Sequence, residues 1–333
     1  MDQFSAHLDR GWDLVQRGDT RGAEASARRA LEIDPQSPEA YNLLGYVAAL
    51  EGETSDAIES YRQAIALDET YLEAMLNAAE VYIHPLGEFD EAIEMCDQAL
   101  DLAETDEEVI DALLLKFDAL LGKGDAKEAA AVIGRVPDEP YKNANHAFLI
   151  GRAYYEIGDI DRAAGLIEEA SVREPNHAEA HYYLGLVRDE RGDSKGATAA
   201  FLRCRQLDLD SAPPSWSLPR ELFGKMVDKA LLALDPILGR YVRDAAAYVS
   251  DVPGIELVAD GVDPRALVLI DGIGTPESPP QSATRIFVYQ RNIERLAGGT
   301  DRLEQEITSA FEREITATFL EGDSAQKDKS QLN

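Results

Sequence analysis

The chain has 333 residues, of which 45% are hydrophobic, and its formal net charge is −31. That length suits about two domains, and no apolar run approaches the roughly 20 residues of a membrane helix. A negative field of this strength repels nucleic acid and anionic lipid and favours basic or cationic partners. The same acidity also suits solubility or a salty cytoplasm, so both interpretations stand.

The start of the chain and its cysteines predict a cytoplasmic protein. Residues 1–5 contain neither a basic start nor an apolar stretch, so we expect no secretory signal. The only cysteines, Cys96 and Cys204, are too few and too far apart for a disulfide framework. Both lie on apolar stripes of expected helices, so we expect buried, reduced thiols.

A glycine followed by an acidic residue recurs six times in the first two-thirds of the chain. The pairs are Gly18-Asp19, Gly52-Glu53, Gly87-Glu88, Gly124-Asp125, Gly158-Asp159 and Gly192-Asp193. Successive pairs are 34, 35, 37, 34 and 34 residues apart, a period typical of stacked helical hairpins. Glycine supplies the left-handed conformation that ends a helix, and the acid then lies near the positive end of the next helix.

Each period divides into two amphipathic halves. Apolar residues recur at helical spacing on both sides of Gly52, and the small residues Gly45 and Ala57 allow two helices to approach closely. The string Tyr41…Leu44-Gly45…Gly52…Ala57…Tyr61…Ala64 resembles the tetratricopeptide repeat (TPR) family. This resemblance implies a mainly α fold, with a right-handed α-solenoid of about six hairpins in residues 1–211. The expected units are about 4–37, 38–71, 72–106, 110–143, 144–177 and 178–211.

The middle of the array is irregular. The third unit carries an extra residue around His84-Pro85-Leu86, and the fourth ends in the proline-containing stretch 136–140. We expect looser packing and a local change of superhelix pitch there. The irregularity is either a hinge or a tolerated loop insertion.

The resemblance also implies a concave groove lined by the first helix of each hairpin. The residues expected in this groove are Trp12, Glu39, Asn42, Tyr46, Glu73, Asn77, Glu80, Asp111, Asp118, Phe148, Arg152, Tyr155, Glu179, Tyr182, Asp189 and Glu190. Aromatic anchors among carboxylates suit a peptide or helix that carries Lys or Arg with apolar residues. The bases with which some TPR proteins grip a C-terminal carboxylate are missing. The alternative for each aromatic residue is a place in the core.

The histidines do not predict a metal site. His177 and His181 have zinc-capable spacing, but His177 falls in a turn between repeats and no cysteine is nearby. We therefore expect no metal and no cofactor in the array.

The composition changes after the repeats. Residues 212–218 predict a linker, and a helix is expected from about Ser217. Three strand-like runs follow, and a long amphipathic helix is expected over about 300–320. The runs are 245–249, 266–270 and 285–289. This order predicts a small α+β domain.

Residues 219–323 resemble the minimal zincin-like metallopeptidases of bacteria. The resemblance rests on three short strings: Ser250-Asp251-Val252-Pro253, Leu267-Val268-Leu269-Ile270-Asp271-Gly272-Ile273 and Ile286-Phe287-Val288-Tyr289-Gln290-Arg291-Asn292. It implies a His-Glu-x-x-His motif on the last helix, where two imidazoles hold zinc and the glutamate activates water. The aligned residues are Arg313-Glu314-Ile315-Thr316-Ala317. The glutamate is present, but both ligand positions have lost their histidines.

We therefore expect a domain without catalysis, in which Glu314 pairs with Arg313 or Arg302 or faces solvent. The tail 324–333 is polar and is expected to be disordered. The first functional hypothesis is a cytoplasmic scaffold or adaptor that binds protein. The alternatives are a dedicated inhibitor or chaperone-like holder of one client, and a hydrolase with a carboxylate metal site. That site would use Glu314, Asp323 and either Glu306 or Glu312.

Overall fold

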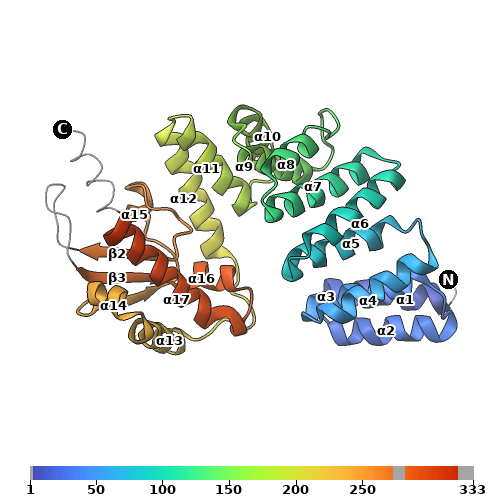
Figure 1. Cartoon of the computed structure of the whole chain (residues 1–333), viewed down its shortest axis with the longest axis horizontal. Coiled ribbons are helices and arrows are strands. Elements are labelled where there is room, and N and C mark those ends of the chain that lie inside the picture. Colours follow the sequence, from blue (N-terminus) through green and yellow to red (C-terminus); the bar gives the residue numbers. More distant parts are fainter. Residues whose placement is uncertain (1–2, 273–281, 322–333) are drawn as a thin grey trace. The chain divides into compact units, whose positions relative to one another are not determined.

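The computed structural model describes residues 3–272 and 282–321 (Figure 1). The chain divides into two compact units, Met1–Arg173 and Glu174–Asn333. The expected tail 324–333 lies outside the described residues.

The first unit is a stack of helical hairpins in which each helix packs against the next one along the chain (Figure 1). This arrangement confirms the expected solenoid of TPR type. The hairpins are α1 (Gln3–Gln16) with α2 (Thr20–Ile33), α3 (Pro38–Glu51) with α4 (Thr54–Leu67), α5 (Leu72–Val81) with α6 (Phe89–Leu102), α7 (Asp106–Lys123) with α8 (Ala126–Ile133), and α9 (Ala144–Glu156) with α10 (Ile160–Arg173).

The glycine–acid pairs form the turns that the sequence predicts. All six glycines adopt a positive φ, between 69° and 89°. The side chains of Asp19, Asp159 and Asp193 accept a hydrogen bond from a backbone N–H in the next helix, at 2.9, 3.2 and 2.9 Å. These bonds satisfy donors that a helix N-terminus otherwise leaves without a partner.

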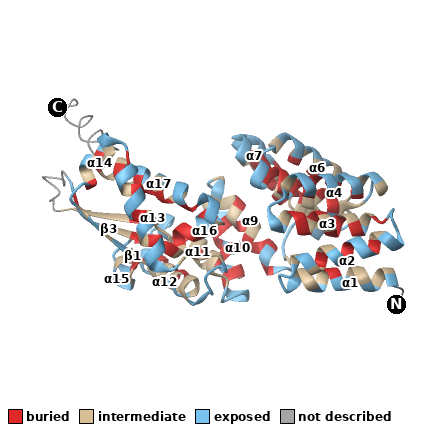
Figure 2. Ribbon diagram, turned by 90° about the horizontal axis from the view of Figure 1, so that it is seen from below, coloured by how far each residue is buried: buried red, intermediate tan, exposed pale blue. Residues whose placement is uncertain are grey.

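Small residues set the distance between paired helices. A Cβ atom added at Gly45 of α3 would lie 2.6 Å from the Tyr61 ring of α4, and one added at Gly151 of α9 would lie 2.8 Å from Ile167 of α10. Tyr61 is 1% exposed, so its ring fills the space above Gly45. Figure 2 shows the buried residues in red on the facing sides of paired helices.

The irregular middle has a structural counterpart. Helix α5 continues into a wide π-type turn, η1 (Tyr82–Leu86), where His84 leaves helical geometry at φ −134° and ψ 115°. This turn takes up the extra residue. Helix α8 has only 8 residues, and residues 134–143 connect it to α9. A change of superhelix pitch here stays a prediction.

The second unit contains the sixth hairpin and the α+β domain. Its elements are α11 (Ala178–Glu190), α12 (Ser194–Asp210), α13 (Arg220–Ala233), α14 (Pro236–Val242), β1 (Ala246–Ser250), α15 (Ile255–Ala259), β2 (Val268–Gly272), β3 (Ala283–Tyr289), α16 (Gln290–Ala297), α17 (Thr300–Thr316) and η2 (Ala317–Glu321). All three expected strands are present. The sequence missed α14, α15 and α16, because helices of 7, 5 and 8 residues are too short to show a clear period.

The three strands form one sheet in the order β1-β3-β2. Strand β1 runs parallel to β3, and β2 runs antiparallel to it. Ile286 and Val288 of β3 are 0% exposed and join a core with Phe223 of α13 and Phe311 of α17. These helices therefore pack on the same face of the sheet.

Arginines join the sixth hairpin to the α+β domain. Asp208 near the end of α12 accepts hydrogen bonds from Arg265 at 3.2 Å and from Arg295 at 2.7 Å. Arg291 donates to the carbonyl oxygens of Asp208, Leu209 and Ser211 at 3.1, 2.9 and 2.7 Å. A cation at a helix C-terminus satisfies carbonyls that lack partners and matches the helix dipole. The repeats end at Asp210, but the last hairpin is part of the second unit.

The close approach at Gly45 gives a testable prediction. Gly45→Ala forces a methyl group against the Tyr61 ring, so we expect a loss of about 1–3 kcal/mol in the free energy of unfolding, measured with urea. The control is Gly165→Ala in α10, where an added Cβ meets no atom within 4 Å. Alanine in that helix should stabilise the protein by up to ~1 kcal/mol. Equal effects of the two substitutions would contradict this packing.

Candidate protein-binding surface

The candidate surface is the first-helix face, formed by the outward side chains of α1, α3, α5, α7 and α9 in the first unit. Helices α1, α3, α5 and α7 each contact the first helix of the next hairpin. Residues about one repeat apart therefore become neighbours. Residues that are separated by a whole repeat in the sequence thus form one continuous surface.

The N-terminal half of this face joins aromatic and amide side chains. The rings of Trp12 and Tyr46, 34 residues apart, meet edge to face with centroids 5.3 Å apart. The Asn77 amide donates to Asn42 at 3.0 Å, and Asn42 donates to Glu73 at 3.2 Å. Asn42 also donates to the Tyr71 hydroxyl at 3.3 Å. These bonds hold α3 and α5 together and orient the Glu73 carboxylate.

Two carboxylates of this half have no basic partner in the described part of the chain. Among residues 3–272 and 282–321, neither Glu73 nor Glu80 forms an ion pair. Burial raises the pKa of the Tyr61 hydroxyl, and the charges of Glu80 and Glu73 raise it further, as does Tyr46. The Tyr61 hydroxyl therefore lies within the electrostatic reach of both acids. We call Trp12, Tyr46, Glu73, Asn77 and Glu80 the Tyr46 cluster.

In the C-terminal half of the face, two acids contact bases of the next hairpin. Arg152 of α9 donates to both carboxylate oxygens of Asp118 on α7, at 3.1 and 3.0 Å. A ring nitrogen of His146 lies 2.9 Å from an Asp111 oxygen. The two pairs are 34 and 35 residues apart, so they are also contacts between successive repeats. Asp111 and Asp118 therefore each have a basic side chain as a partner, unlike Glu73 and Glu80.

Two expected groove residues are corrected by their burial. Asn42 is 0% exposed and Phe148 is 1% exposed, so neither side chain can meet a partner at the surface. Phe148 belongs to the core between α9 and its neighbours, which is the alternative that the sequence left open. Asn42 instead acts as a buried link between the repeats.

The remaining expected residues have different surroundings. Glu39 is exposed and accepts a hydrogen bond from Ser37 at 2.8 Å. Tyr155 is half-buried on α9, and Asp189 is exposed on α11 in the second unit. Tyr182 of α11 donates to Asp263 at 2.9 Å, and the Arg265 guanidinium lies 4.6 Å above its ring. Tyr182 therefore already binds residues of the α+β domain.

Sequence reasoning missed Tyr61, Tyr71 and His146. The one-repeat step from Asp111 to His146 could have revealed that pair. Tyr71 lies in a turn between repeats, outside the first-helix positions, and no sequence signal places its hydroxyl beside Asn42. Tyr61 was assigned to the signature only, although the charges of Glu80 and Glu73 on the next hairpin help to raise the pKa of its hydroxyl.

The two cysteines agree with expectation. Cys96 and Cys204 are free and buried. Burial is the main reason that the pKa of each thiol is raised to about 12. Such thiols remain protonated and unreactive at neutral pH.

The degenerate metal motif lies at the end of α17. Arg313 and Ala317 are exposed, and Glu314 is half-buried. Burial raises the pKa of Glu314, and the charge of Arg313 opposes this shift. Arg302, one of the alternative partners expected for Glu314, instead donates to Glu306 at 2.9 Å. Within the described residues no group of three His, Cys, Asp or Glu could hold a metal. Asp323 lies outside them.

Because the pKa of Glu314 is raised, we expect the substitution Glu314→Gln to increase the stability of the protein in a pH-dependent way. When the pKa of a carboxyl is higher in the folded protein than in the unfolded chain, the folded protein becomes less stable as the pH rises through these two pKa values. The glutamine variant should therefore be more stable than the original chain at neutral pH. The two should converge near pH 3, which lies about one unit below the usual pKa of glutamate. Urea unfolding at both pH values measures this; a difference that grows as pH falls would contradict it.

No helix in the described part of the chain is long and apolar enough to cross a membrane.

Comparisons with known proteins identify the repeats. A tetratricopeptide repeat model matches residues 8–71 and 148–211, and a second one matches residues 48–110. The type IV pilus assembly protein PilF of Pseudomonas aeruginosa is 43% identical over 63 residues, which are 19% of this chain and 25% of that protein. The chain thus matches about a quarter of that relative's length.

Solved structures share the fold. The P. aeruginosa PilF structure matches 63% of this chain and 93% of its own, at 20% identity and a TM-score of 0.53. The structure of PilW, a type IV pilus biogenesis factor, matches 62% and 94%, at 18% identity and a TM-score of 0.54. Identities this low show the fold alone. The chain therefore carries tetratricopeptide repeats, built as a helical solenoid and followed by a small domain with a three-stranded sheet.

Proposed function

We propose that this chain is a protein-interaction scaffold whose first-helix face binds a peptide or helix with basic and apolar residues. The observation that carries the proposal is the Tyr46 cluster. It combines two aromatic rings with two carboxylates that have no basic partner among the described residues. TPR arrays are general protein-binding scaffolds, which supports the same function.

The chemistry of the Tyr46 cluster selects a basic partner. An arginine or lysine can pair with Glu73 or Glu80 while its aliphatic stem packs on an aromatic ring. The half-buried rings of Trp12 and Tyr46 can also take an apolar side chain. A C-terminal carboxylate would be repelled here. The arginine of the neighbouring hairpins, Arg152, already binds Asp118.

The named relatives support a role in assembly rather than in chemistry. PilF is described as a pilus assembly protein and PilW as a pilus biogenesis factor. Both descriptions fit proteins that hold others together. We propose the scaffold role for this chain, and we do not propose that it acts in a pilus.

For the C-terminal domain we propose a metallopeptidase-like scaffold that has lost catalysis and binds no cofactor. Arginine and alanine stand where the resemblance requires zinc-binding histidines, and the glutamate alone cannot hold the metal. The carboxylate-based hydrolase remains the competing hypothesis. The cytoplasmic location stays a prediction.

Selection from a displayed random peptide library tests the proposed partner chemistry. We expect enrichment of peptides with Lys or Arg beside aromatic or aliphatic residues. Reversing the charge with Glu73→Lys and Glu80→Lys together should weaken the selected peptides at least about tenfold, or ~1.4 kcal/mol. Affinity is measured by fluorescence anisotropy over a range of salt.

The matched control reverses two acids on second helices, Glu59→Lys and Glu94→Lys. Both residues are exposed and lie at the sixth position of 14-residue helices, α4 and α6. This control changes the net charge equally but leaves the first-helix face intact. If both double variants weaken binding equally, the net charge matters and the Tyr46 cluster does not.

Metal analysis of the purified chain decides between the scaffold and the hydrolase. We expect no stoichiometric zinc after purification with zinc present, because imidazole ligands are missing from the motif. One tightly bound metal per chain that is lost in Glu314→Ala would establish the carboxylate site instead.

A further inference from the structure

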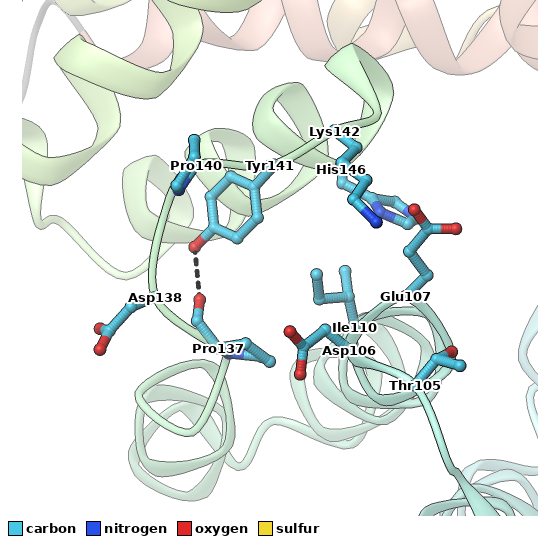
Figure 3. A pocket seen from close by; sticks show the side chains of 10 residues that line it. All are labelled: Thr105, Asp106, Glu107, Ile110, Pro137, Asp138, Pro140, Tyr141, Lys142 and His146. Atoms are coloured by element: carbon cyan, nitrogen blue, oxygen red, sulfur yellow. Dashed lines mark hydrogen bonds between the residues drawn. The ribbon is translucent and has the colours of Figure 1, made fainter.

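The connection between α8 and α9, residues 134–143, closes a pocket against the start of α7. The pocket has a volume of about 270 Å³. Figure 3 shows side chains of α7 on one side and those of the connection and α9 on the other. Its lining consists of Thr105, Asp106, Glu107, Ile110, Pro137, Asp138, Pro140, Tyr141, Lys142 and His146. The stretch that looked like a hinge or an insertion thus builds a defined cavity.

The wall of this pocket is held in place by hydrogen bonds. The Tyr141 hydroxyl donates to the Pro137 carbonyl oxygen at 2.9 Å (Figure 3). Arg173 of α10 donates to the Tyr141 carbonyl oxygen at 2.8 Å and also to that of Lys142. These bonds fix the half-buried Tyr141 ring from both ends. A ring held in this way needs little ordering when it binds a ligand.

The charges around the ring are mostly negative. Asp106, Glu107 and Asp138 are exposed, and none of them forms an ion pair with a described residue. The neighbouring Glu108 instead caps α7 together with Thr105. Lys142 is the only lysine or arginine in the lining, and His146 already binds Asp111. The pocket therefore favours a cation despite the positive end of the α7 dipole.

Elsewhere in the chain, two tyrosine rings that lie near carboxylates are covered by an arginine. Arg162 lies 5.2 Å above the Tyr154 ring and 3.4 Å from Asp159. In the second unit, Arg265 lies 4.6 Å above the Tyr182 ring and 3.2 Å from Asp208. In both cases an arginine stacks on a tyrosine and pairs with a carboxylate. This arrangement combines cation–π attraction with an ion pair.

The Tyr141 ring lines a pocket that also contains carboxylates. Lys142 is part of this lining, but no arginine or lysine of the described chain lies over the ring. The apolar walls from Ile110, Pro137 and Pro140 match the aliphatic stem of a long side chain. The volume suits a single side chain and excludes a folded element.

We infer that this pocket accepts one arginine side chain of a peptide partner, stacked on Tyr141 and paired with Asp106 or Glu107. Arginine is favoured over lysine because its planar guanidinium can stack and donate in the same plane. The inference rests on the proposed function for the peptide nature of the partner. The pocket shares no residue with the Tyr46 cluster, so the two sites can be tested separately.

Nuclear magnetic resonance of the full chain tests the pocket with a minimal probe. The probe is N-acetyl-arginine amide, and its control is N-acetyl-citrulline amide, which keeps the shape but lacks the charge. We expect saturable shifts of the amides of Tyr141 and Lys142 with arginine. Citrulline should bind at least about fivefold more weakly, since it forms neither an ion pair nor a cation–π contact. Equal shifts with both probes, or shifts confined to other residues, would overturn the inference.

Variants assign the effect to the pocket. Asp106→Asn with Glu107→Gln should weaken the arginine probe at least about fivefold, and Tyr141→Leu should do the same through loss of the ring. Glu59→Gln with Glu94→Gln removes the same charge elsewhere and should leave binding unchanged. Retained binding in either pocket variant, with a native-like spectrum, contradicts the inference. The Glu73 and Glu80 reversal should not affect this probe, so the pocket can stand even if the Tyr46 cluster fails.

Discussion

The structure depends on the close approach of two helices at a small residue of the first helix. At Gly45 the Tyr61 ring occupies the space of a side chain, and at Gly151 the contact is with Ile167. This distance fixes the shape of each hairpin and lets successive hairpins stack. Stacking brings side chains that are 34 or 35 residues apart into contact. The first-helix face is the direct result of this packing.

The contacts between repeats divide that face by charge. In its C-terminal half, Asp111 contacts His146 and Asp118 contacts Arg152, and each partner lies one repeat away. Its N-terminal half is joined by rings and amides instead, and Glu73 and Glu80 remain without a base among the described residues. The expected acidic groove thus contains two kinds of acid: Glu73 and Glu80 have no base among the described residues, whereas Asp111 and Asp118 each have one.

The periodic parts of the fold could be predicted from sequence because the same local physics recurs in each unit. Glycine ends the first helix, an acid begins the second, and small residues set the spacing. The three strands were also predictable from their apolar runs. The burial of individual side chains could not be predicted in this way. Phe148 and Tyr46 both occupy first-helix positions, yet only Phe148 is fully buried. Their burial depends on neighbouring hairpins that no local pattern describes.

The contacts of the last hairpin were unpredictable for a similar reason. Tyr182, Asp208 and Arg265 lie far apart in the sequence and meet only because α12 docks on the α+β domain. This docking binds Tyr182 within its own chain and gives α12 an arginine cap. The same contact is an example, in this chain, of an arginine that binds both a tyrosine ring and a carboxylate. The same chemistry suggests what the acidic parts of the array can recognise.

The fluorescence of Trp12 tests the central claim most directly, because this ring forms part of the Tyr46 cluster. In a Trp216→Phe variant, Trp12 is the only tryptophan. The probes are an amphipathic Lys/Leu peptide and a Glu/Leu peptide of equal length. The account predicts a saturable change of Trp12 emission with the Lys/Leu peptide alone, and weaker binding as salt rises. Binding of the Lys/Leu peptide without a change at Trp12, or equal binding of both peptides, would contradict it.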